Sequence, residues 1–314
     1  MYLEFYGLKE LPFELTSSPR FLLPAPSHRE ALSNLRYGIE SRKALTVLTG
    51  EAGTGKTTLI RSVLSALDGG AHVCSLSNPT LSRVEFVESL ASGFGLSKEA
   101  SKSKAAMLSE LESALRARRA AGRHTALIVD EAQSLSDELL EEIRLLANIE
   151  GDDGKLLPIV LAGQPELSSR LNRRRLRQIK QRISLRCELR PLDLHETAAF
   201  IAGRIRASGG DSARVFTREA VTLIHERSGG IPRMICVLCD NALVNGFALD
   251  RRPVTRDLVL DVCRDFDIGG PQAIVKSLEN KPAEAAPPPQ PADDPTPSEP
   301  VLAEAMPRRR FRFF

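Results

Sequence analysis

Residues 50–57 read Gly-Glu-Ala-Gly-Thr-Gly-Lys-Thr, and this stretch decides the fold. It fits the pattern G-x-x-x-x-G-K-[ST], in which glycines let successive backbone N–H groups face one anion. The apolar run 44–49 before it is rich in β-forming residues and predicts a buried strand. Residues 58–67 after it carry apolar side chains at helical spacing. A helix that begins at the loop offers unpaired N–H groups to an anion, so the loop is expected to bind phosphate.

The polar residues of this loop predict how ATP and Mg²⁺ are bound. Lys56 is expected to reach the β- and γ-phosphates, and the Thr57 hydroxyl is expected to bind Mg²⁺. The alternative, a glycine-rich turn without a ligand, is weakened by the strand and helix on either side. The residues expected to contact the nucleotide or its metal are Gly50, Glu51, Ala52, Gly53, Thr54, Gly55, Lys56, Thr57, Thr58 and Asp130.

A second motif supplies two adjacent carboxylates. Residues 126–131 read Ala-Leu-Ile-Val-Asp-Glu, an apolar strand pattern that ends in acid. Asp130 is expected to hold Mg²⁺, directly or through a water, and Glu131 to orient and deprotonate the attacking water. Neighbouring residues on an extended strand point to opposite faces, which predicts separate roles for the two carboxylates. The alternative is a solvated acidic turn, and the glycine loop upstream makes it the weaker interpretation.

Strand and helix patterns alternate through the middle of the chain and predict a three-layer α/β fold with a parallel sheet. After Pro191 the strand patterns cease and helical patterns predict an all-helical lid. The expected strands are 44–49, 71–77, 125–129, 156–162 and 183–189, and the expected helices are 84–94, 105–119, 138–149, 194–207, 217–228, 232–249 and 255–266.

These patterns divide the chain into four predicted parts. Residues 1–43 form a lead-in with a helical stripe from Ser27 onward. Residues 44–191 form the nucleotide-binding domain and residues 192–268 the lid. Residues 269–314 are rich in proline and predict a disordered tail that ends in a basic-aromatic tip.

Composition limits the class of protein. The chain has 314 residues, of which 42% are hydrophobic and 26% charged, and these fractions are typical of a soluble globular protein. A net charge of +3 gives no broad basic field for nucleic acid. Five cysteines without a regular framework suit a reducing cytosol. No signal peptide or apolar run long enough to span a membrane is evident, so a cytoplasmic location is expected.

Two further polar residues are candidates for the nucleotide site. Gln164 follows the expected strand 156–162 and is expected between the glycine loop and Glu131, where it would contact the γ-phosphate or the water. A strand-ending turn is the alternative. Arg233 follows Gly-Gly-Ile-Pro at a helix start and would point across the cleft to the nucleotide, or else lie on the surface. His28 is expected to be a structural histidine, with contact to adenine as the alternative.

A basic run leaves three interpretations open. Residues 170–182 hold seven cationic side chains in thirteen positions. They predict a solvated helix face, a patch for the phosphate backbone of nucleic acid, or an arginine that reaches the γ-phosphate bound by a neighbouring subunit. Only arginine offers a permanently charged planar fork for the third role.

Together these pieces resemble the AAA+ ATPases of the ExeA/GspA secretion and MshM type, from the N-terminus to about residue 267. The resemblance implies that Gln164 is the sensor 1 residue, that Arg182 is the arginine finger with Arg177 second, and that Arg233 is the sensor 2 arginine. The segments that carry it are Phe5–Leu8, Pro12–Phe13, Ser27–Leu32, Gly163–Leu167, Leu176–Ile183, Gly229–Arg233 and Cys239–Leu243.

The resemblance also implies an ATP-dependent homo-oligomer and a role in envelope export. Relatives serve type II secretion, pilus or exopolysaccharide systems, so an inner-membrane export component is the expected partner, with a peripheral location at that membrane. More distant relatives are transposition regulators that assemble on DNA, which makes an ATP-dependent DNA-binding regulator the alternative. ExeA-like proteins continue through a membrane helix into a peptidoglycan-binding domain. Here the Pro-rich segment leads to Arg308–Phe314, so direct cell-wall anchoring is not expected.

Overall fold

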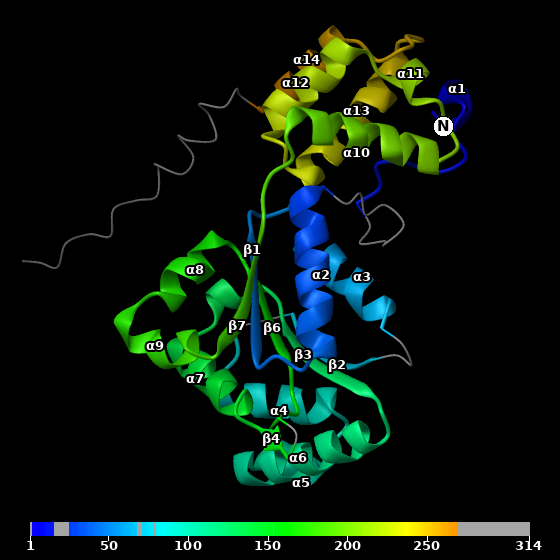
Figure 1. The fold of residues 1–314 in the computed structure, drawn as a ribbon. Helices are drawn as coiled ribbons and strands as arrows, with labels where there is room; N and C mark the ends of the chain where they lie inside the picture. Colours follow the sequence, from blue (N-terminus) through cyan, green and yellow to red (C-terminus); the bar gives the residue numbers. More distant parts are fainter. Residues whose placement is uncertain (1, 16–24, 68–70, 78–79, 153, 269–314) are drawn as a thin grey trace, which may run out of the picture.

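A five-stranded sheet organises the first part of the molecule (Figure 1). The strands lie in the order β2-β3-β6-β1-β7, and every pairing among them is parallel, which confirms the predicted α/β class. The computed structural model describes residues 2–15, 25–67, 71–77, 80–152 and 154–268. The strands are β1 Leu45–Gly50, β2 Ala71–Leu76, β3 His124–Val129, β6 Ile159–Gly163 and β7 Ile183–Leu189.

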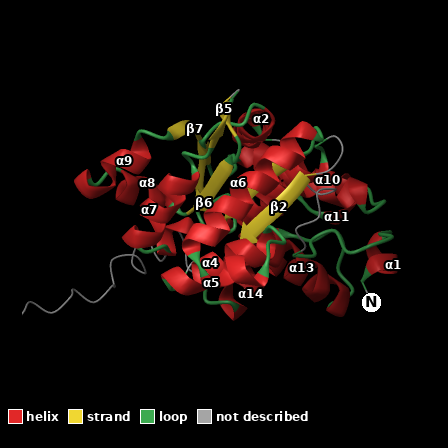
Figure 2. Cartoon of the chain, turned by 90° about the horizontal axis from the view of Figure 1, so that it is seen from below, coloured by secondary structure: helices red, strands yellow, loops and turns green. Residues whose placement is uncertain are grey.

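Helices cover both faces of this sheet and complete three layers, as Figure 2 shows from below. Side chains alternate between faces along each strand. Leu48 of β1 packs with α2 (Pro26–Glu40) and α3 (Lys56–Ser65), whereas Val47 packs with the helices of the other face. The elements on that other face are α4 Arg83–Gly93, α5 Lys98–Lys102, α6 Lys104–Ala120, η2 Ala132–Ser134, α7 Asp137–Leu146, α8 Pro165–Leu171, η3 Arg174–Leu176 and α9 Arg177–Lys180.

The predicted strand 156–162 begins too early. Strand β6 starts at Ile159, because a small hairpin of β4 (Glu150–Gly151) and β5 (Gly154–Lys155) comes first. The Leu156 N–H donates to the Ile149 carbonyl and closes this excursion rather than joining the main sheet. Leu156 is nevertheless buried. Its apolar side chain serves the packing of the core, and the sequence pattern therefore resembled that of a buried strand.

The second part is all-helical and lies above the carboxyl ends of the strands (Figure 1). Its core joins apolar side chains from every long helix of the lid. The cap of α10 is a capping box between Asp193 and Glu196, and Pro232 opens α13, where its missing N–H costs nothing. The helices are α10 Leu194–Ala207, α11 Ser212–Val215, α12 Arg218–Ser228, α13 Pro232–Ala248 and α14 Arg256–Asp265.

The predicted lead-in divides between the two parts. Helix α1 (Leu3–Tyr6) and Phe13 are packed in the core of the helical lid, and the Arg204 guanidinium donates to the Pro12 and Glu14 carbonyls. Helix α2 instead packs on the sheet. The first residues of the chain therefore fasten the lid, while residues 26–40 belong to the sheet layer.

The predicted tail, residues 269–314, lies outside the described residues. Within the part of the chain that the structure describes, no helix is both long and apolar enough to cross a bilayer. All five cysteines are buried and free.

Candidate active site

The loop between β1 and α3 has the backbone of an anion cradle. Gly53 and Gly55 have φ of 83° and 100°, a region that side chains with a Cβ rarely adopt. Gly53 also needs its lack of a side chain, because a Cβ there would lie 2.8 Å from the Arg233 Cβ. Lys56, the first residue of α3, is buried and its ammonium donates to the carbonyls of Gly50 (2.7 Å) and Glu51 (3.1 Å).

Burial lowers the pKa of Lys56, while the carboxylates of Glu131 and Asp130 oppose that shift. The ammonium thus sits in a partly desolvated site, where its attraction to an anion is less screened than in water. The Lys56 ammonium donates to neutral carbonyls of its own loop. Charged phosphate oxygens would form stronger hydrogen bonds with the same ammonium.

Thr57 and Asp130 meet at the predicted metal position. The Thr57 hydroxyl donates to Asp130 Oδ2 at 2.7 Å, although Thr57 belongs to α3 and Asp130 follows the end of β3. A hydroxyl and a carboxylate oxygen side by side are the hard ligands that Mg²⁺ prefers. These residues therefore fit Mg²⁺, with the remaining ligands left to water and phosphate.

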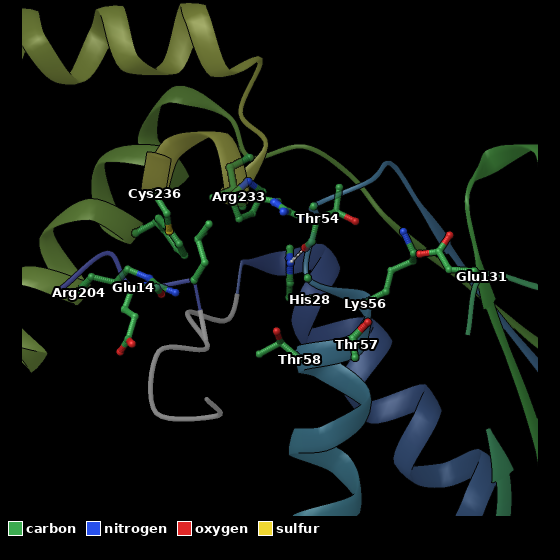
Figure 3. Close-up of a pocket in the computed structure, with 16 residues that line it drawn as sticks. Glu14, His28, Thr54, Lys56, Thr57, Thr58, Glu131, Arg204, Arg233 and Cys236 are labelled. Carbon is green, nitrogen blue, oxygen red and sulfur yellow. Dashed lines mark hydrogen bonds between the residues drawn. The ribbon is translucent and has the colours of Figure 1, made fainter. Parts of the chain in front are cut away.

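The backbone at Glu131 differs from the extended strand that was expected. Strand β3 ends at Val129, so Asp130 and Glu131 are not neighbours on an extended strand. Glu131 instead has φ 51° and ψ 36° and begins the short helix η2. This left-handed turn, not strand alternation, separates the two carboxylates: Asp130 contacts Thr57, while Glu131 lines the phosphate cavity (Figure 3).

Gln164 comes directly after β6 and is not among the residues that line the cavity. Its predecessor Gly163 pairs with Thr49 at the carboxyl end of β1, and β6 runs between β1 and β3. The Gln164 N–H donates to the side-chain oxygen of Gln133 (3.0 Å), and the amide of Gln133 donates to Glu131 Oε2 (2.6 Å). Sequence reasoning missed Gln133, since its only signal is a polar residue two positions after Glu131.

The site opens into a cavity of about 340 Å³ between the loop and the lid (Figure 3). Its polar end is formed by the loop residues Gly53–Thr58 and Glu131. Its other end is formed by lid residues and by the end of the lead-in: Glu14, Leu15, Leu192, Phe200, Arg204, Pro232, Arg233 and Cys236. A polar end with phosphate-binding groups and a more apolar end suit a nucleotide, whose base and phosphates differ in the same way.

Two contacts tie the lid and α2 to the loop. The Arg233 N–H donates to the Gly53 carbonyl at 3.2 Å, and the Arg233 side chain lines the cavity. His28 Nε2 lies 2.9 Å from the Thr54 carbonyl and donates to it, with His28 itself buried (Figure 3). His28 thus has a structural contact with the loop itself, and it also lines the cavity.

Arg182 lies away from the site in its own chain. It precedes Ile183, which pairs with Leu45 at the amino end of β1, whereas the loop follows the carboxyl end of that strand. Arg182 lines a separate polar cavity with Arg42, Lys43 and Lys155. Arg173, Arg174, Arg177 and Lys180 line another cavity beside it, so the basic run forms a surface at this side of the molecule.

Comparison with known proteins agrees with this geometry. A family model described as "AAA domain" matches residues 39–171. The chain is 38% identical over 248 residues to General secretion pathway protein A of Aeromonas hydrophila, a match that covers 79% of this chain and 45% of that protein. The chain therefore spans about half the length of this curated relative.

Solved structures share the fold. The ORC2 protein of Aeropyrum pernix, solved in ADPNP and ADP complexes, has a TM-score of 0.64 at 17% identity, over 87% of this chain and 76% of that chain. The RuvB Holliday junction branch migration motor of Thermotoga maritima has a TM-score of 0.52 at 21% identity, over 79% and 71%. Identities this low speak for the fold alone. The AAA domain match and the 38% identity support an AAA+ ATPase that resembles General secretion pathway protein A over the part the two chains share.

Proposed function

We propose that the chain binds ATP with Mg²⁺ in the cavity between loop and lid and hydrolyses it with Glu131 as the base. This proposal rests on how the predicted residues come together. Lys56, Thr57 and Glu131 all line one cavity, and Asp130, from a different part of the chain, contacts Thr57. A carboxylate that faces the phosphate end can accept the proton of a water poised for in-line attack.

Each residue around the cavity has a distinct proposed role. Lys56 and the N–H groups of residues 50–58 bind the phosphates, and Thr57 and Asp130 hold Mg²⁺, which neutralises charge on the phosphoryl oxygens when it is bound. Gln164 orients the water or the γ-phosphate. Arg233 reports the state of the nucleotide to the lid, which is supported by its backbone contact with Gly53.

Arg182 is proposed to complete the site of a neighbouring subunit. The separation between Arg182 and the loop within one chain supports a role in trans, because only a second copy would bring this guanidinium to a γ-phosphate. Arg177 of the same surface is the second candidate. The proposed active form is therefore a homo-oligomer.

In the cell, we propose that ATP turnover powers or switches an envelope export or assembly system, with an inner-membrane component as partner and a cytoplasmic or peripheral location. The 38% identity to General secretion pathway protein A supports this role. A DNA-binding regulator remains the alternative, and the cavity lined by Arg173, Arg174, Arg177 and Lys180 suits a phosphate backbone. The relative with a shared sequence is a secretion protein, so export is favoured.

Export measured in the source cells tests the role. The chromosomal copy is changed to Glu131→Gln, and secreted protein in the medium is compared with that of wild type. Glu219→Gln, which removes the same charge from an exposed position on α12, is the matched control. Export should fall with Glu131→Gln and persist with Glu219→Gln. Unchanged export, together with salt-sensitive and ATP-dependent DNA binding by the purified protein, would support the alternative instead.

A further inference from the structure

The side chain of Gln133 connects the proposed base, Glu131, to the backbone that follows β6. Gln133 lies on η2, half-buried, and donates from Nε2 to Glu131 Oε2 at 2.6 Å. Its Oε1 accepts from the Gln164 N–H at 3.0 Å. A backbone N–H can only donate, so the oxygen of the amide must face Gln164 and the nitrogen must face Glu131. Both ends of the amide are thus committed.

The neighbouring backbone leaves a seat for this side chain. Gly163 ends β6, and a Cβ at that position would lie 2.7 Å from Gln133 Oε1 and 3.0 Å from the Leu167 Cδ2. Any larger residue at 163 would push the amide out of its place between Gln164 and Glu131. The glycine is therefore matched to Gln133 and not only to the turn that follows the strand.

Arg170 and Asp137 fix the backbone position of Gln133. The Arg170 guanidinium on α8 donates to the Gln133 carbonyl through Nη1 and to Asp137 Oδ1 through Nη2 at 2.7 Å. Asp137 also forms an ion pair with Arg175. The Arg170 and Asp137 side chains are 17% and 19% exposed, so this pair is shielded, whereas Arg175 is 64% exposed within the basic run.

We propose that Gln133 is a positioning residue for hydrolysis, which aims the Glu131 carboxylate at the phosphate cavity, and that Arg170 holds Gln133 in place. This inference rests on the proposed role of Glu131. A base works when its own orientation is set by a third group, and the amide of Gln133 meets that need although Gln133 is not among the residues that line the cavity. The other carboxylate oxygen of Glu131 is left for the water.

The chain of contacts also gives the basic surface a route to the active site. From Arg175 it runs through Asp137, Arg170 and Gln133 to Glu131.

Steady-state ATP hydrolysis by the full chain tests the proposal with Gln133→Met, which keeps the length of the side chain and removes both hydrogen bonds. We expect kcat to fall about 10-fold or more, in the range seen when residues that support a reacting group are lost. KM for ATP and the affinity for a non-hydrolysable ATP analogue should stay within about twofold, because no substrate contact is removed. Gly163→Ala should lower kcat in the same way by displacing the amide.

Two comparisons separate positioning from general damage. In a Glu131→Gln background, Gln133→Met should cause no further loss in single-turnover hydrolysis, since both changes act through one group. Arg170→Met should lower kcat less than Gln133→Met, whereas Arg264→Met, which breaks an exposed pair on α14, should leave it unchanged.

Three results would overturn the proposal. A Gln133→Met protein with kcat within twofold of wild type, beside an inactive Glu131→Gln protein, would show that Glu131 needs no orienting amide while leaving the proposed base intact. Losses that multiply in the double variant would show that Gln133 acts elsewhere. Normal turnover by Glu131→Gln itself would refute both the proposed base and its positioning residue.

Discussion

Single residues determine the shape of the phosphate loop. The peptide between Thr54 and Gly55 is planar, so its carbonyl and its N–H point in opposite directions. His28 donates to the Thr54 carbonyl at 2.9 Å, and this contact therefore also sets the direction of the Gly55 N–H. The imidazole is buried and comes from α2, far from the loop in sequence. His28 is thus part of the loop's architecture although it lies outside the motif.

Substituting His28 should weaken nucleotide binding. His28→Ala leaves the Thr54 carbonyl without its buried donor, a loss of about 1 kcal/mol, which corresponds to about fivefold weaker affinity for ATP and ADP. Isothermal titration calorimetry measures this change. His195→Ala, at an exposed position of α10, is the matched control and should bind as wild type does. Equal affinities for the His28→Ala and wild-type proteins would contradict this role.

At the scale of elements, a buried carboxylate joins three helices below the sheet. Glu142 of α7 accepts ion pairs from Arg83 of α4 and Lys104 of α6, and its side chain is 10% exposed. Burial by itself raises the pKa of Glu142, but the hydrogen bonds from Lys104 and Arg83 outweigh burial and hold the pKa below its ordinary value. The folded state thus favours the charged form of Glu142 more strongly than the unfolded state does.

This shift predicts a pH-dependent loss of stability. A lowered folded pKa stabilises the fold above the ordinary pKa of glutamate, and that contribution is lost as the pH falls through the folded pKa. Glu142→Gln weakens the hydrogen bonds from two cations and should therefore reduce the free energy of unfolding by about 2 kcal/mol at neutral pH. Urea unfolding at pH 7 and at progressively lower pH measures the effect. The difference from wild type should shrink toward acid, and a constant difference would contradict the assignment.

Sequence periodicity predicted most elements, and the misses have physical causes. The long lid helices α10, α12, α13 and α14 were predicted within a residue at each end, because features such as Pro232 at the start of α13 are local signals, whereas the short α11 was missed. Two predictions were wrong: that a strand begins at residue 156, and that the backbone at Glu131 is extended. Each feature depends on contacts that no local pattern encodes. Gln133 was missed for the same reason, because its partners Glu131 and Gln164 follow two different strands, β3 and β6.

On the scale of the whole molecule, the lid and the sheet domain are linked at several points around the nucleotide cavity. The chain passes from the sheet into α10 through Leu192, whose N–H donates to Gly230, and Arg233 then contacts Gly53. The N-terminal residues fasten to the lid, while α2, which follows them, packs on the sheet. A change at the phosphates therefore has direct routes to the lid.

The proposed shared site predicts rescue between defective subunits. Arg182→Ala should bind ATP but hydrolyse it poorly, and Lys56→Ala should fail to bind ATP tightly. In a mixture, the intact loop of the first protein receives the intact Arg182 of the second, so activity should partly return. The rate of phosphate release at varied mixing ratios measures this. Rates that stay at the sum of the two separate proteins would contradict a finger in trans.

The central claim is that Glu131 is the base of an ATPase site formed by the loop Gly50–Thr57 and Asp130. Nucleotide affinity and single-turnover hydrolysis of Glu131→Gln, measured on the same preparation, test it most directly. The account predicts that ATP binds about as tightly as to wild type while hydrolysis falls about 100-fold or more. Hydrolysis within a fewfold of wild type would contradict it.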